Sequence, residues 1–292
     1  MLRRSMLVAF VLWGICTTPS YGQVKLEWKF KEGEQFTLEA LMSSREKATY
    51  LGKEQKQDLT LNFVFEFKVI RKFSDVTVLE QKIESIRAEG SDAVSMTTLN
   101  EMLNEFKGKK FKVTLNSKNQ MQRFEGYLAV VNDIAKGDQT AASRVKELFP
   151  EENLKTLVNE TFGTLPEKPI TANTKWGGKF SVPLGDFGVL TGTTDYTYAG
   201  TVDDKEKITV EARVTGYTPP KRGGDVAPAK EGPPKAENVK GVIFFDRSAG
   251  KLLSSEMSMT IKGSFRVPGP MGQETTVDMS QDRTIRLKMV KK

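Results

Sequence analysis

Hydrophobic and polar residues alternate along much of this chain, which is the pattern of β-strands with one face in a core. The clearest run is 59–70, where every second residue from Leu59 to Val69 is apolar. Similar alternation predicts strands at 24–30, 35–50, 75–86, 111–115, 121–124, 176–182, 195–200, 207–215, 240–246, 251–267 and 275–289. Short polar turns between many of these segments favour antiparallel hairpins.

The pattern changes to helical spacing between 127 and 162. Leu128, Val131 and Ile134 recur every three residues, and similar spacing continues over 140–149 and 152–162. This predicts two or three short helices. The expected fold class is therefore mainly β (α+β), a large antiparallel sheet or an open barrel or sandwich, with these helices inserted at about 127–162.

The first 22 residues have the order of a secretory signal peptide. Arg3 and Arg4 precede an apolar run at 6–16, which is about half as long as a membrane-spanning helix. Small residues at Ser20 and Gly22 predict cleavage after Gly22. We therefore expect a protein exported to the periplasm or the extracellular space.

Two alternatives to cleavage stay open. The apolar run could remain as an uncleaved anchor, or Cys16 could carry a lipid. A lipoprotein signal usually has a small residue before the cysteine, and Ile15 does not fit that pattern. After cleavage, we expect no membrane-spanning segment.

The remaining residues, 23–292, are predicted to form one exported β-rich domain. An alternative division gives two similar halves, 23–126 and 170–292, joined by helices over 127–165. It rests on a tryptophan that is followed shortly by Lys-Phe near the start of each half. Segment 218–237 is rich in Pro, Gly, Lys and Glu, which predicts a flexible loop.

Two absences restrict the chemistry. The chain has no histidine, and its single cysteine, Cys16, lies in the predicted signal peptide. These absences exclude Ser-His-Asp and Cys-His catalysis, zinc or copper sites built on His or Cys, and structural disulfides in the mature chain. We expect no metal or cofactor.

Charge adds little to this picture. The formal net charge is +7, and loss of Arg3 and Arg4 with the signal peptide lowers it to +5. The basic residues are scattered rather than gathered in a block, so no nucleic-acid partner is expected.

Few side-chain groups suggest a site. The pairs Asp203–Asp204 and Glu151–Glu152 lack the spacing of a calcium loop, so turn or helix-end acids are the simpler interpretation. The aromatic stripe of Phe63, Phe65 and Phe67 fits ordinary sheet core better than the wall of an apolar groove. We predict no catalytic, cofactor-binding or metal-binding residue, and the ligand-lining residues are unknown at this stage.

Three short motifs resemble an uncharacterised family of exported bacterial proteins, the domain-of-unknown-function family six-two-six-three. They are the start LEWKF with EGE at 26–34, Leu165-Pro166 followed by Trp176, and the hairpin around Phe245-Asp246 and 250–252. The resemblance implies a β-rich exported domain and brings no catalytic residue. More loosely, a long antiparallel sheet with a few helices is similar to periplasmic lipoprotein carriers, in which a curved sheet holds an acyl chain.

The favoured function is a non-catalytic exported envelope or periplasmic protein that binds an apolar or acyl ligand or a protein partner. The alternative is a carboxylate-dependent hydrolase of the cell envelope.

Overall fold

The computed structural model describes residues 22–184, 187–219, 227–228, 232–268 and 273–290. Its strands are β1 (Gln35–Tyr50), β2 (Lys53–Lys72), β3 (Val76–Gly90), β4 (Lys110–Asn116), β5 (Met121–Glu125), β6 (Lys175–Pro183), β7 (Val189–Val202), β8 (Lys205–Thr218), β9 (Ala227–Pro228), β10 (Lys235–Asp246), β11 (Lys251–Pro268) and β12 (Glu274–Val290). Its helices are α1 (Ala93–Asn104), α2 (Tyr127–Ala135), α3 (Gln139–Leu148) and α4 (Glu151–Phe162).

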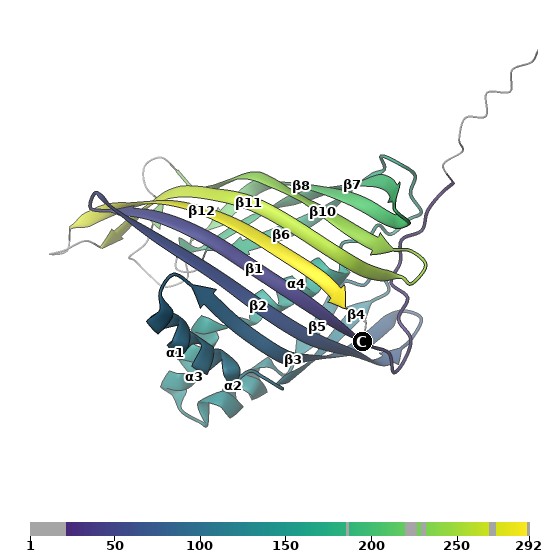
Figure 1. Ribbon diagram of the computed structural model, residues 1–292, viewed down its shortest axis with the longest axis horizontal. Coiled ribbons are helices and arrows are strands. Elements are labelled where there is room, and N and C mark those ends of the chain that lie inside the picture. Colours follow the sequence, from purple (N-terminus) through teal and green to yellow (C-terminus); the bar gives the residue numbers. More distant parts are fainter. Residues whose placement is uncertain (1–21, 185–186, 220–226, 229–231, 269–272, 291–292) are drawn as a thin grey trace, which may run out of the picture.

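The strands form one large antiparallel sheet (Figure 1). Its order is β5-β4-β3-β2-β1-β12-β11-β10-β8-β7-β6, and the short β9 pairs with β11. Neighbours along the chain pair within two blocks, β1–β5 and β6–β12, and the pairing of β1 with β12 joins the blocks. The sheet is open, with β5 and β6 at its edges. The predicted fold class, mainly β with inserted helices, is confirmed.

The two or three short helices predicted over 127–162 are present as three, α2, α3 and α4. The sequence analysis did not predict α1, because Ser, Thr and Asn residues dilute its apolar spacing. Asp92 starts this helix by accepting hydrogen bonds from the backbone N–H groups of Val94 and Ser95. In Figure 1, α1, α2 and α3 lie together beside β3, and α4 appears behind the long strands.

The strand predicted at 24–30 is wrong, although its predicted inward face is correct. Leu26, Trp28 and Phe30 are buried, but the segment pairs only through a single bridge between Val24 and Ile170. No free strand edge runs beside it, because β1 pairs with β2 and β12. The segment is instead held as extended chain between α4 and the β10–β11 hairpin.

The first core lies between the helices and the inner face of the sheet. Phe65 and Phe67 are at most 1% exposed, and their rings pack in a row with Phe63. Phe162 of α4 packs edge-on against Phe67 and Trp28. The aromatic stripe is therefore sheet core, as the sequence predicted, and it does not line a groove.

A second core lies where the sheet curves back on itself. It joins Val182 at the end of β6 to Ile261 and Phe265 of β11 and Met279 of β12. β6 is not a neighbour of β11 or β12 in the sheet, so these contacts cross the inside of the curve. None of the helices in the described part of the chain takes part in this core.

Two predicted segments fall largely outside the described residues. Residues 1–21 of the predicted signal peptide lie there, as do 220–226 and 229–231 of the predicted loop. The end of that loop segment belongs to β10, which starts at Lys235 rather than at the predicted residue 240.

Candidate functional site

The inside of the curved sheet is approached from one side by α4, whose C-terminal end is held by two tryptophans. The Trp28 indole N–H donates to the carbonyl oxygen of Phe162 at 3.2 Å, and that of Trp176 donates to the carbonyl oxygen of Thr164 at 2.9 Å. Carbonyl groups at a helix end lack partners within the helix, so these bonds satisfy them. They also fix the last turn of α4, which carries Glu160.

Glu160 faces a small inner cavity of about 20 Å³, which is room for one water molecule. The cavity is lined by Glu160, Thr164, Tyr196, Ile243, Ser255, Met257, Ile285 and Leu287. The Glu160 side chain keeps a small accessible surface. Because Glu160 lines this cavity, we attribute that surface to the interior of the molecule.

Burial changes the titration of the two ionisable groups at the cavity. Removal from water raises the pKa of Glu160 to about 7, and it raises the pKa of Tyr196 to about 12 with a further contribution from the Glu160 charge. Among the described residues, the Glu160 carboxyl has no hydrogen bond or ion pair. A carboxyl of this kind is able to hold a proton near neutral pH.

Next to the cavity, a row of partly exposed apolar side chains crosses four strands. We call this row the inner belt; it consists of Leu61, Met42, Ile285 and Met257 on β2, β1, β12 and β11. Each residue stands directly opposite the next in the register of the sheet. All four pack against the first core, and Met257 also packs against the second. The belt is thus the seam between the two cores.

A cluster of polar side chains borders the inner belt. It is centred on Arg283, which occupies the inward-facing position of β12 next to Ile285. Arg283 donates from Nε to Oε1 of Gln281 at 2.5 Å and from Nη1 to the carbonyl oxygen of Pro183 at 2.6 Å. Gln281 in turn donates from Nε2 to Glu46 of β1 at 3.0 Å. The site therefore combines an apolar wall with a carboxyl on one side and a guanidinium on the other.

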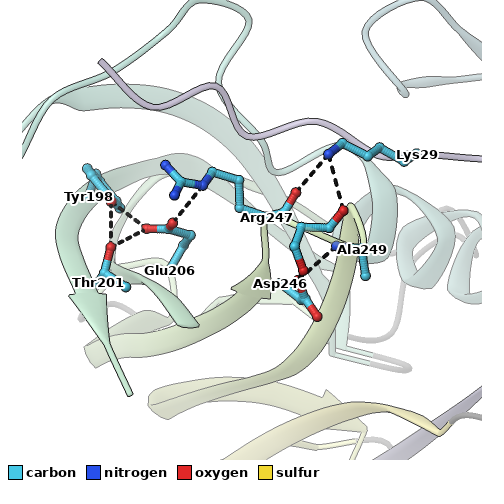
Figure 2. A network of polar contacts seen from close by, with 8 residues as sticks. Lys29, Tyr198, Thr201, Glu206, Asp246, Arg247 and Ala249 are labelled. Atoms are coloured by element: carbon cyan, nitrogen blue, oxygen red, sulfur yellow. Dashed lines mark hydrogen bonds and ion pairs between the residues drawn. The ribbon is translucent and has the colours of Figure 1, made fainter. Parts of the chain in front are cut away.

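Away from the inner belt, a separate polar network connects the hairpin ends of β7–β8 and β10–β11 (Figure 2). The buried Glu206 accepts hydrogen bonds from the hydroxyls of Tyr198 and Thr201, the latter at 2.9 Å. Its other oxygen lies 3.3 Å from Nε of Arg247. Nearby, Lys29 donates to the carbonyl oxygens of Arg247 and Ser248. Both Glu206 oxygens are engaged, so this network serves structure rather than acid–base chemistry.

An open hollow of about 510 Å³ lies elsewhere, beside residues 232–237. Its lining mixes lysines with acids, and Lys262 pairs with Glu237 across it at 2.8 Å. Because its lining consists mainly of charged, hydroxyl and glycine residues, this hollow is the weaker candidate for an apolar ligand.

The family-model comparison matches residues 61–225, more than half of the chain, with the Family of unknown function (DUF6263). The chain belongs to DUF6263. The family prediction made from the sequence motifs is thus confirmed. The matched part of this DUF6263 protein contains Leu61, Glu160 and Tyr196, whereas Met42, Met257 and Arg283 lie outside it. No curated protein matches the chain.

Among solved structures, the DUF6263 chain is similar to lipovitellin, at 9% identity and a TM-score of 0.43. The match covers 90% of this chain and about a quarter (26%) of the lipovitellin chain. A DUF1329 family protein from Desulfovibrio piger matches at 9% identity and a TM-score of 0.16, covering 86% of this chain and 84% of that one.

A putative outer membrane lipoprotein-sorting protein domain from Vibrio parahaemolyticus matches at 8% identity and a TM-score of 0.14. That match covers 87% of this chain and 83% of the other. All three TM-scores lie below 0.5, so we draw no functional inference from these likenesses.

The residues singled out by the sequence are not brought together at this site. In the structure, Glu151 and Glu152 both lie near Lys155, and Asp203–Asp204 form the β7–β8 turn. Within the described ranges, no cluster of three His, Cys, Asp or Glu residues could hold a metal ion. In that same part of the chain, every helix is too short or too polar to cross a membrane.

Sequence reasoning missed Glu160 and Arg283. A signal for Arg283 was present, because Gln281 and Arg283 interrupt the apolar face of the strand predicted at 275–289. Glu160 gave no comparable signal, since a glutamate in a short amphipathic helix is normally exposed.

Proposed function

We propose that this protein is an exported, non-catalytic binding protein that holds an apolar or acyl ligand against the inner belt. The observation that supports this proposal is the belt itself, a continuous row of partly exposed apolar side chains on an inward-facing wall. Ordinary core positions on the same strands are sealed: Leu38 and Phe65 are fully buried. The belt positions retain accessible apolar surface, whose removal from water by a ligand is favourable.

The side chains of the belt suit a ligand of variable shape. Met42 and Met257 are unbranched and flexible, so they adapt to different apolar partners. The inner cavity holds only about 20 Å³, whereas pockets for small molecules measure about 300–1,000 Å³. Binding therefore requires the ligand to lie along the belt and to displace side chains or move α4 away from the sheet.

Export is the second part of the proposal. It rests on the signal-peptide pattern of residues 1–22 and predicts Gln23 as the mature N-terminus. Soon after this point the chain is part of the fold, because Val24 pairs with Ile170 and Leu26 is buried. Mass spectrometry of the exported protein tests this part; an intact N-terminus or a lipid on Cys16 would contradict it.

Binding can be tested with a fluorescent apolar probe such as an anilinonaphthalene dye. Met257→Gln keeps the length of the side chain while making it polar, so it should weaken probe binding about tenfold. Ser258→Gln is the matched control, because it places the same side chain on the opposite face of β11. Equal binding by both variants and the natural protein would contradict the proposed site.

One observation favours the alternative, a carboxylate-dependent hydrolase. A buried carboxyl with a pKa near neutrality is typical of general acids. However, Glu160 is the single carboxyl among the cavity-lining residues, and hydrolysis normally uses an acid and a base or nucleophile together. Glu160→Gln should therefore leave probe binding intact; loss of an ester- or glycoside-cleaving activity in this variant would favour the enzyme.

A further inference from the structure

Arg283 joins two walls of the curved sheet. It projects from the inner face of β12 and reaches the carbonyl oxygen of Pro183 at the end of β6. These strands are not neighbours in the sheet, so the side chain crosses the inside of the curve. Its position on β12 is one inward step, about 7 Å, from Ile285 of the inner belt.

No carboxylate of the described residues contacts the guanidinium of Arg283 directly, and the nearby Glu46 is linked to it through Gln281. Both hydrogen bonds that it makes go to neutral oxygens, those of Gln281 and Pro183. The Glu46 carboxylate bonds to Gln281 instead, and among the described residues no acid forms an ion pair with Arg283. A partly buried cation that has no direct contact with an anion gains stability when a ligand supplies one.

The guanidinium remains charged and reachable. Burial lowers the pKa of Arg283 to about 10, against the opposing effect of the Glu46 charge, so the group is still protonated at neutral pH. Part of the side chain is exposed, and within the described part of the chain its hydrogen bonds use Nε and Nη1 and leave Nη2 available. Guanidinium N–H groups form strong, directional hydrogen bonds to carboxylate and phosphate oxygens.

We propose that Arg283 binds the anionic head of a long-chain acyl amphiphile whose tail lies along the inner belt. This inference rests on the proposed apolar binding function and specifies its ligand class. Arg283 stands beside Ile285, and from there the belt continues over Met42 to Leu61, two inter-strand spacings or about 10 Å, which covers part of an acyl chain. Ser44, opposite Arg283 in the β1–β12 register, places a hydroxyl beside the same head group.

The experiment compares palmitate with hexadecanol, which share the chain and differ in head charge, on the mature protein at pH 8. Binding is measured by displacement of the apolar probe. The natural protein should bind palmitate at least tenfold more tightly than hexadecanol. Arg283→Gln, which keeps a donor for the Pro183 carbonyl, should abolish this preference while hexadecanol binding persists. Arg286→Gln, on the outer face of the same strand, should keep the preference.

The remaining arms separate the sources of the anion. Hexadecyl phosphate should compete as palmitate does, whereas inorganic phosphate alone should not displace the probe. Displacement by inorganic phosphate would overturn the amphiphile assignment in favour of a free-anion site. Arg283→Lys retains the charge and should keep part of the preference, so the test stands even if Arg283→Gln is poorly folded.

Failure of the two proposals can be told apart. If the natural protein binds neither palmitate nor hexadecanol, the apolar binding function itself is wrong. If it binds both equally, or if Arg283→Gln keeps the preference for palmitate, the belt binds apolar chains but Arg283 is a structural link between β12 and β6.

Discussion

The two cores of this protein are built on one sheet but closed in different ways. The first core is covered by helices and is rich in large aromatic rings, among them Phe36, Phe65, Phe67 and Phe162. The second core has no helix, and Phe265 is its one fully sealed aromatic ring among the described residues. There the open sheet curves so that its own inner face packs together, mainly through aliphatic and methionine side chains.

This difference explains why the candidate site lies between the two cores. Helices cover most of the inner face of the first block, and the curvature of the sheet covers the far end of the second block. Between these two regions, neither the helices nor the curvature of the sheet covers the inner face fully. The inner belt therefore keeps part of its apolar surface accessible. The candidate site thus lies in the gap between the part of the sheet covered by helices and the part that packs against itself.

The largest expected effect tests whether the two cores fold as one unit. Phe65→Ala and Phe265→Ala each remove a fully buried ring, one from each core. Each should lower the free energy of unfolding by about 3–5 kcal/mol. If the cores are coupled, both variants shift one common unfolding transition, measured in urea by circular dichroism and tryptophan fluorescence.

Two results would contradict this view. A separate early transition in Phe265→Ala alone would show that the second core unfolds independently. A loss below about 1 kcal/mol in Phe65→Ala would mean that the ring borders open space and is not packed core.

The next largest effect concerns Glu160, at the seam between the cores. Its pKa in the folded protein, about 7, is higher than its ordinary value of 4.5, so the folded state binds the proton more tightly than the unfolded chain. Stability should therefore fall as pH rises from about 4.5 to 7 and stay lower above that range. Glu160→Gln removes this cost and should stabilise the protein at pH 8 by up to about 3 kcal/mol.

Melting temperatures at pH 4.5, 6 and 8 provide the measurement. Natural protein and Glu160→Gln should converge at the lowest pH and separate as pH rises. Glu152→Gln, at an exposed position on the same helix, is the control and should leave the pH profile almost unchanged. Parallel profiles for Glu160→Gln and the natural protein would show that the Glu160 carboxyl is well hydrated.

Much of the sheet could be predicted from sequence, because alternation is a local property of each strand. The pairing of β1 with β12 could not, since it joins residues 35–50 to residues 274–290 and leaves no local trace. The segment 24–30 shows the opposite error: its alternation is real, but it lies between α4 and the β10–β11 hairpin rather than beside an edge strand of the sheet. The candidate site escaped prediction because α4, β1 and β12 come together only in the folded chain.

A smaller change in stability is expected from replacing a buried polar residue of the first core. Gln81 of β3 is fully buried, and neither its Oε1 nor its Nε2 has a hydrogen-bond partner. Its register neighbours, Phe67 and Phe111, are apolar. Gln81→Met has a similar shape without the unsatisfied groups, so it should raise the free energy of unfolding by about 1–2 kcal/mol.

Chemical denaturation measures this gain, and Gln57→Met at an exposed position of β2 is the control. An unchanged or lowered stability for Gln81→Met would indicate that Gln81 is hydrated or bonded in solution. Gln81 would then have a polar partner in the first core that the described contacts do not include.

The smallest effect is expected on the outer face of β11 and β12, the strands that connect the two cores. Arg286 and Glu256 stand directly opposite each other and form a two-pronged ion pair, with contacts of 3.0 and 3.3 Å. Both side chains are about half exposed, so water and salt screen their attraction. Arg286→Gln should cost about 0.5 kcal/mol at low ionic strength and nearly nothing in 1 M salt. Thermal unfolding at the two salt concentrations measures this difference. A loss above about 2 kcal/mol that persists in salt would show that the outer face, and not only the two cores, holds the curved sheet in shape.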